Sequence, residues 1–424
     1  MRQFMRCVCL AAFLATGLAS RARAQKALTW EEVRARFEAN NPTLHAGQIG
    51  IDESKANEIT AYLRPNPGLT LAADGTQIAP HDGVWKPVAG TFESVTVSYL
   101  HERQHKRELR RDSAQEATGI AVSGQSDLER NLIFALRGAF VGTLQAEAVL
   151  RVAQDNLKYW DQVLAISRDR FAAGDIAQID LDRLELQRVQ FKADVQTAEV
   201  NLRTSKIELL MLMNDRTPVE QFRVTGSFDY NDQIKPLDDF RQIALDRRPD
   251  LRAALQSVDK ANTDYRLAAA NGSTDPTLSA WYTHNGSYNN PLALETLGVS
   301  VSFPLRIFDR NQGEKLRTQL DVGRNEKVLD ATRAQVFNDV DSAYAVVNSN
   351  LILLRPYKAR YLDLATRVRE TVRFSYEHGG ASLLDFLNAE NDFRSVQLNY
   401  VNLVGAYLIA ASQLNLAVGQ EVVQ

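Results

Sequence analysis

The 424-residue sequence contains only two cysteines, Cys7 and Cys9, and both lie near its start. Residues 1–24 carry arginines first, then an apolar stretch, then small residues on either side of Arg23, which is the pattern of a cleaved secretory signal. We therefore expect a signal peptide at residues 1–24, and a mature chain without thiols. Such a chain forms neither disulfides nor cysteine-ligated metal sites. No small-residue lipobox precedes either cysteine, so we expect no lipid anchor there.

The sequence also lacks a basic surplus and a long apolar run. Loss of the four arginines in the signal lowers the Lys plus Arg count from 49 to 45, against 52 Asp plus Glu, for a net charge of −7. This balance argues against a nucleic-acid partner, because nucleic-acid-binding domains present a basic surface. No later stretch approaches the roughly 18 uninterrupted apolar residues of a membrane helix. We expect an exported chain that is periplasmic, secreted, or inserted in an outer membrane as strands.

Repetition is the most informative feature that is present. From Thr29 to Asn214, and again from Leu237 to Gly419, the same expected order recurs: a short helix, a helix marked by a proline, two strands and two long helices. A repeat of ~200 residues is too long for a solenoid unit and indicates a duplicated half-molecule. The predicted organisation is a first repeat at 25–214, a linker at 215–236, a second repeat at 237–419 and a short tail at 420–424.

Long helices are predicted by apolar residues that recur every seven positions, the spacing of a coiled-coil-like seam. No proline occurs from Arg103 to Ala173, and a continuous helix of that length measures on the order of 105 Å. The predicted long helices are 103–173, 178–213, 310–377 and 382–417. In the second repeat the expected seam is Val340, Val347, Leu354, Tyr361 and Val368.

Four strands are predicted by strict alternation of apolar residues with serine, threonine and glycine. They are residues 68–76, 92–100, 276–284 and 295–304. Their length suits tilted outer-membrane strands, with lipid on the apolar face and water on the other. The aromatic residues expected at the membrane interface are Tyr99, Trp281, Tyr282 and Phe303. Four strands cannot close a membrane barrel, so several copies would have to pool theirs. A half-buried sheet in a water-soluble protein is the alternative.

A turn pattern links the two long helices of each repeat. It reads aromatic-x-x-Gly-x(5)-Asp, and it occurs once from Phe171 to Asp180 and once from Tyr376 to Asp385. Each glycine is placed for a left-handed helix C-cap, and each aspartate lies near the start of the next helix, where the helix dipole favours a carboxylate. Capping alone explains both aspartates. In a threefold assembly, one carboxylate per chain near the axis would also form an acidic ring that attracts cations.

Catalytic patterns are scarce. Residues 101–105 spell His-Glu-Arg-Gln-His, the HExxH pattern that places two zinc-binding histidines on one helical face. Here the pattern falls at a predicted strand-to-helix junction, lacks a recognisable third ligand and has no counterpart in the second repeat. We interpret it as a solvent-exposed polar segment beneath the predicted barrel. We find no nucleophile triad, phosphate-binding loop or paired-carboxylate site, and we expect no enzyme, no cofactor and no resident metal.

Taken together, these patterns resemble the trimeric outer-membrane factor (TolC-like) family, the exit ducts of tripartite efflux and type I secretion systems. Arg64-Pro65-Asn66-Pro67, with the segments at 303–305 and 308–313, is similar to the cation-exporting branch. The resemblance implies a mainly α-helical homotrimer with a small β portion: a 12-stranded barrel in outer-membrane lipid, continued by a periplasmic α-helical tunnel. It also implies a periplasmic adaptor (membrane fusion) protein, an inner-membrane transporter of the resistance-nodulation-division type, and small molecules or metal ions as cargo.

The resemblance assigns a periplasmic gate. Tyr376 and Asp180 match the pair that ties the inner helical hairpin to its neighbour, and Asp385 matches the first of two acidic rings. The second ring position is Asn388 and the tip arginine position is Ala381, so we expect fewer polar links in the closed state. The adaptor-contacting tips are expected to be Phe171, Gly174, Asp175, Gly379, Gly380 and Ala381. A periplasmic coiled-coil adaptor or scaffold without a pore is the alternative, although adaptors usually carry one hairpin and this chain has two.

Overall fold

The computed structural model describes residues 27–88, 90–285 and 294–423, so the expected signal peptide lies outside the described part. The chain divides into two compact units that cut across the two repeats. The first unit contains the chain up to His45 together with Leu128–Arg248 and Val336–Gln424, and the second contains Ala46–Asp127 and Pro249–Gln335. Each repeat therefore contributes segments to both units.

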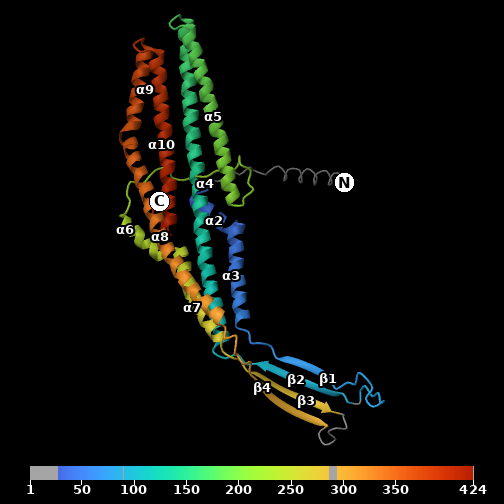
Figure 1. Ribbon diagram of the computed structural model, residues 1–424. Helices are drawn as coiled ribbons and strands as arrows, with labels where there is room; N and C mark the ends of the chain where they lie inside the picture. Colours follow the sequence, from blue (N-terminus) through green and yellow to red (C-terminus); the bar gives the residue numbers. More distant parts are fainter. Residues whose placement is uncertain (1–26, 89, 286–293, 424) are drawn as a thin grey trace, which may run out of the picture. The chain divides into compact units, whose positions relative to one another are not determined.

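The order of elements repeats as the sequence predicts, and the chain is mainly helical with one small sheet (Figure 1). The first repeat contains α2 (Trp30–Asn40), α3 (Pro42–Ala61), β1 (Gly68–Asp74), β2 (Phe92–Leu100), α4 (Lys106–Ala172) and α5 (Gln178–Leu212). The second contains α6 (Leu237–Arg247), α7 (Pro249–Asn271), β3 (Thr277–Asn285), β4 (Glu295–Ser302), α8 (Gln312–Pro356), the π-helical turn η1 (Tyr357–Tyr361), α9 (Leu362–Glu377) and α10 (Leu383–Val418).

The prolines that mark the short helices stand at helix starts. Pro42 and Pro249 are the first residues of α3 and α7, where the missing N–H of proline has no intrahelical partner to lose. The side chain of Asn41 caps α3 by accepting hydrogen bonds from the backbone N–H groups of Thr43 and Leu44, at 2.9 and 3.1 Å. Each predicted proline-marked helix is thus a separate helix that follows a short one.

The sheet belongs to the second unit and is antiparallel throughout, in the order β1-β2-β3-β4. Its register puts apolar side chains on one face and serine, threonine and glycine on the other, as expected from the alternation. Rows across the apolar face are Leu71, Val95, Tyr282 and Leu297; Leu69, Val97, Ala280 and Val299; and Tyr99, Leu278 and Val301. Many of these side chains are strongly exposed, for example Leu297 at 80% and Val299 at 77%.

Trp281, one of the expected interface aromatics, lies on the opposite face of the sheet from Tyr282. Neighbouring residues of a strand point to opposite faces, so Trp281 lies on the polar face, in one row with Thr70, Thr96 and Gly298. Its indole lies over Gly298: a Cβ atom added to that glycine would be 2.2 Å from the ring. The register therefore places Trp281 away from the face predicted to contact lipid, whereas Tyr282 is on that face.

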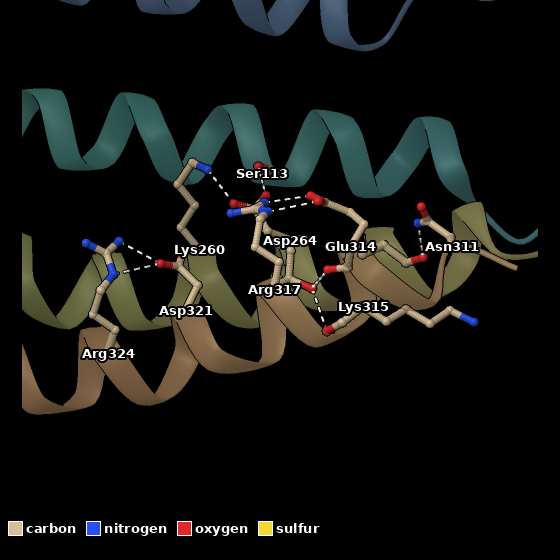
Figure 2. Close-up of polar contacts among 11 residues, drawn as sticks. Ser113, Lys260, Asp264, Asn311, Glu314, Lys315, Arg317, Asp321 and Arg324 are labelled. Carbon is tan, nitrogen blue, oxygen red and sulfur yellow. Dashed lines mark hydrogen bonds and ion pairs between the residues drawn. The ribbon is translucent and has the colours of Figure 1, made fainter. Parts of the chain in front are cut away.

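The helices of the second unit are joined by polar contacts along α7 (Figure 2). Asp264 on α7 accepts hydrogen bonds from Ser113 Oγ on α4 at 2.5 Å and from Lys260 Nζ at 2.6 Å. Near the start of α8, the amide of Asn311 donates to the carbonyl of Ala268 at 2.8 Å. At the start of α4 the ammonium of Lys106, only 3% exposed, pairs with Asp275 at 2.6 Å.

In the first unit a large apolar cluster joins α2 to α4, α5 and the segment after α5. Phe37 and Leu136 are fully buried in it, and Phe222 is 1% exposed. A parallel bridge between Leu28 and Val224 holds the segment that precedes α2 against the linker. The linker is therefore packed on the helices of its own unit.

Two described helices, α4 and α10, contain an 18-residue stretch with the length and composition of a membrane-crossing helix. The expectation that no later segment approaches such composition is too strict for these two. In α10, 56% of that stretch is buried inside the structure, and in α4 33% is. Partial burial of this extent is typical of helices that pack against other helices. Core helices of water-soluble proteins can have the same length and composition.

Candidate functional site

Two helical hairpins of the first unit, α4–α5 and α9–α10, meet in an apolar cluster that we call the hairpin cluster (Figure 1). Its buried members are Trp160, Leu164, Leu181, Leu184, Phe191, Tyr376, Leu383 and Phe386. Trp160 is fully buried, donates from its indole N–H to the carbonyl of Leu184 at 2.9 Å, and stacks on Phe386 with ring centroids 6.0 Å apart. The cluster fixes one hairpin against the other in one chain.

The turns at the hairpin tips have the predicted left-handed glycines. Gly174 has φ 84° and Gly379 has φ 76°, conformations that side chains with a Cβ adopt only with strain. The turn after α4 is closed by a hydrogen bond from Asp175 N–H to the carbonyl of Arg170 at 2.8 Å. The turn after α9 is closed in the same way, from Gly380 N–H to the carbonyl of Ser375 at 2.7 Å. The C-cap prediction is confirmed for both turns.

Asp385 has the capping role that its position predicted. Ser382 is the N-cap of α10, and its backbone N–H and hydroxyl donate to the Asp385 carboxylate at 3.1 and 2.7 Å. The Asp385 N–H donates back to Ser382 Oγ at 3.2 Å, which completes a capping box. These hydrogen bonds lower the pKa of the exposed Asp385 carboxyl below its usual range. Asn388 lies three residues further along α10 and is also exposed.

Tyr376 and Asp180 come from different hairpins, and the charge of Asp180 acts on the Tyr376 phenol. Tyr376 is 9% exposed and its ring stacks on Phe386, with centroids 5.0 Å apart and planes at 9°. The guanidinium of Arg170 lies 5.4 Å from the same ring. Burial raises the pKa of the Tyr376 phenol, Arg170 opposes that shift, and the negative charge of Asp180 adds to it. Tyr376 is therefore held mainly by its apolar packing against the hairpin cluster.

The residues assigned to the tips differ in exposure. Gly174, Asp175, Gly379 and Gly380 are exposed, whereas Ala381 is partly buried against the hairpin cluster. Phe171, which also continues the seven-residue spacing of α4, is 37% exposed, so the buried seam ends before it. Its ring is therefore accessible at the tip of the α4–α5 hairpin.

The first long helix of the second repeat was predicted to be continuous over 310–377, but the structure divides it. Pro356 ends α8 and is followed by the π-helical turn η1, because proline lacks the N–H that the α-helical ladder needs. A π turn adds a residue, which shifts the phase of everything after it. Val340, Val347 and Leu354 are fully or almost fully buried, but Tyr361 and Val368 are 42% and 44% exposed. The buried side instead continues through Leu362, Arg369 and Tyr376.

A buried polar group beside the hairpin cluster was not identified from the sequence. Glu390 on α10 is 5% exposed, and its carboxylate accepts a hydrogen bond from the Tyr159 hydroxyl on α4 at 2.9 Å. Arg369 lies close by, with its guanidinium 4.9 Å from the Tyr159 ring and 3.9 Å from the Phe393 ring. From the seven-residue pattern alone, a glutamate next to a seam position, such as Glu390, is predicted to be solvent-exposed. Only the shifted phase after Pro356, which turns Arg369 inward, would have signalled this cluster.

The HExxH segment does not adopt the helical geometry that zinc binding requires. Gln104 and His105 have φ values of 58° and 54°, and α4 begins only at Lys106. Glu102 is held by Arg110, with atoms 2.5 Å apart, instead of pointing to a shared site. Among the residues that the structure describes, no group of three histidine, cysteine, aspartate or glutamate side chains is placed to hold a metal ion.

Comparison with known proteins gives a consistent result. The family model described as outer membrane efflux protein matches residues 240–420. The chain is 20% identical over 396 residues to the cobalt-zinc-cadmium resistance protein CzcC of Cupriavidus metallidurans, covering 93% of this chain and 90% of that protein. It is 23% identical over 391 residues to nodulation protein T of Rhizobium leguminosarum bv. trifolii, covering 87% and 80%. A crystal structure of CusC, studied for folding and transmembrane channel formation, superimposes with a TM-score of 0.78 at 16% identity over 92% of each chain.

Proposed function

We propose that this chain is an outer-membrane efflux channel of the outer membrane efflux protein family and that it works as a homotrimer. In this proposal the strands of three copies form one barrel in the outer membrane, and the helices of three copies line a tunnel in the periplasm. The channel itself is passive. The energy for export comes from an inner-membrane transporter, and no catalytic activity is assigned to the chain.

The open sheet is the observation that carries the trimer. Among the described strands, β1 and β4 are at the edges and each pairs on one side only. Unpaired backbone N–H and C=O groups are not tolerated in lipid, so a sheet with edges cannot enter a membrane alone. Three copies of a four-stranded sheet supply twelve strands, and β4 of one copy then pairs with β1 of the next. The strongly exposed Leu69, Leu71, Leu297 and Val299 would face lipid.

The gate is proposed at the hairpin tips. Asp385 is exposed near the start of α10, and three copies would form a ring of carboxylates that attracts cations. Asn388 occupies the position of a second ring without adding charge. Tyr376 and Asp180 would hold the α9–α10 hairpin against the α4–α5 hairpin in the closed state. The support for this is the electrostatic effect of Asp180 on the Tyr376 pKa across the two hairpins, together with the burial of Tyr376.

The partners are proposed from the exposed tips. The turn residues Gly174, Asp175, Gly379 and Gly380, with the exposed ring of Phe171, present a surface for a periplasmic adaptor. Because the first relative reported above is named a cobalt-zinc-cadmium resistance protein, we propose metal cations as cargo and a resistance-nodulation-division transporter as the pump. A passive channel needs no coordinating residues for its cargo, since transport requires only that the ion pass.

The decisive experiment is extraction of the protein from outer membranes in detergent, followed by mass determination and insertion into planar bilayers. We expect a trimer that is shifted in gel mobility by heating and that gives discrete conductance steps. A detergent-independent monomer without conductance would overturn the channel and would favour the alternative, a periplasmic scaffold without a pore. Co-purification after cross-linking in cells would identify the adaptor and the transporter.

A further inference from the structure

We propose that Tyr159 and Glu390 form a pH-sensitive latch between the α4–α5 and α9–α10 hairpins, closed by acid and weakened by alkali. The proposal deepens the gate proposed above and rests on that function. It assigns a role to two residues outside the tip positions discussed so far. Tyr159 directly precedes Trp160 of the hairpin cluster on α4, and Glu390 follows Phe386 of that cluster by one helical turn on α10.

The geometry of the latch is a single hydrogen bond between the two hairpins. The Tyr159 hydroxyl on α4 donates to Glu390 Oε1 on α10 at 2.9 Å. Glu390 is 5% exposed, so its carboxyl depends on protein partners for its hydrogen bonds. Separation of the hairpins breaks this bond and exposes the carboxyl to water. The protonation state of Glu390 is therefore linked to whether the hairpins are packed.

The charged neighbours of Glu390 are on α9, and they partly oppose one another. Arg369 and Arg373 on α9 favour the ionised carboxylate, whereas Glu370 on the same helix disfavours it. Glu370 is itself engaged by both arginines, at 2.6 Å from each guanidinium. The two positive charges are thus shared with a second carboxylate and do not fully compensate a buried glutamate. Tyr159 is the titratable group that faces Glu390 from α4.

The direction of the pH effect follows from burial. Burial raises the pKa of Glu390 above its ordinary value of 4.5, and the hydrogen bond from Tyr159 and the charge of Arg369 only partly offset the shift. A carboxyl with a raised pKa in the packed state binds a proton more tightly there than when the hairpins separate. Packing is then favoured at low pH, and that advantage is lost as the pH rises from 4.5 through the raised pKa.

The test is the closed-state leak of the reconstituted trimer in planar bilayers between about pH 5 and pH 8, the range above the ordinary glutamate pKa. We expect the open probability of the unmodified trimer to rise with pH. The isosteric Glu390→Gln keeps an acceptor for Tyr159 but cannot titrate, so its open probability should lose that pH dependence. Tyr159→Phe should raise the open probability by about tenfold at low pH, the effect of one hydrogen bond to a buried polar group.

The matched control is Tyr407→Phe. Tyr407 is 1% exposed and donates to the carbonyl of Asn231 at 2.9 Å, so this variant loses an equally long hydrogen bond elsewhere in the same unit. The latch is overturned if Glu390→Gln keeps the pH dependence of the parent, or if Tyr159→Phe leaks no more than Tyr407→Phe. Every variant is compared only as a heat-modifiable trimer. An unmodified trimer with no conductance at any pH would instead overturn the proposed function.

Discussion

The Phe386→Ala substitution tests the hairpin cluster as the main apolar contact between the two hairpins. Phe386 is 1% exposed and lies between Trp160 and Tyr376, with ring centroids 6.0 and 5.0 Å away. Truncation of a buried phenylalanine costs about 3 kcal/mol or more, because transfer and cavity terms add. Loss of the two aromatic pairs adds to this free-energy cost. A cost of about 3 kcal/mol makes local opening on the order of 100-fold more frequent.

Native-state hydrogen exchange of the detergent-solubilised trimer measures that opening directly. We expect the protection of amides in residues 383–393 to fall on the order of 100-fold, while amides near the sheet keep theirs. Phe374→Ala is the control, since Phe374 is on α9 of the same hairpin but is 61% exposed. Equal protection in the Phe386 and Phe374 variants would refute the reasoning, because it would mean that the buried ring adds nothing to hairpin contact.

Three further outcomes follow from the contacts. Tyr376→Phe removes the phenol that senses Asp180 and should raise leak conductance; an unchanged leak would leave the residue with a packing role only. Asp385→Ala should lower cation selectivity, whereas Asp385→Asn should lower it equally but keep α10 capped. Because the pKa of Asp385 is lowered from its ordinary value of 3.8, the carboxylate should stay charged at pH 3.8 and lose its charge only in stronger acid. Gly298→Val should clash with Trp281 and reduce the yield of heat-modifiable trimer, while Gly313→Ala, with open space where the added Cβ would lie, should not.

The sequence was sufficient wherever the determinants are local. The order of elements in each repeat, the proline at the start of α3 and α7, and the left-handed Gly174 and Gly379 all depend on residues close together in the chain. Alternation also predicted the two faces of the sheet. The same alternation places Trp281 and Tyr282 on opposite faces, because adjacent strand residues point in opposite directions.

What the sequence did not predict depends on phase and on contacts between distant segments. Extending the seven-residue spacing through Pro356 placed Tyr361 and Val368 in a seam, whereas the π turn moves the buried side to Arg369 and Tyr376. The hydrogen bond between Tyr159 and Glu390 joins residues 231 positions apart. No periodic pattern predicts such a pair, because either residue alone fits a solvated helix surface.

The contacts between the hairpins also predict how closure responds to salt. At the tips, Ala381 and Asn388 carry no charge, and the hairpin cluster beside them is apolar and buried. Arg394 on α10 pairs with Asp194 on α5, but this ion pair is only partly exposed and lies away from the turns. Salt screens interactions between exposed charges over a distance that shortens from about 10 Å at 0.1 M to about 3 Å at 1 M, whereas it leaves buried apolar contacts intact or stronger. We therefore expect the open probability in bilayers to change little between about 0.1 and 1 M KCl, once bulk conductivity is divided out. Opening that increases steeply with KCl would show instead that exposed ion pairs hold the hairpins together.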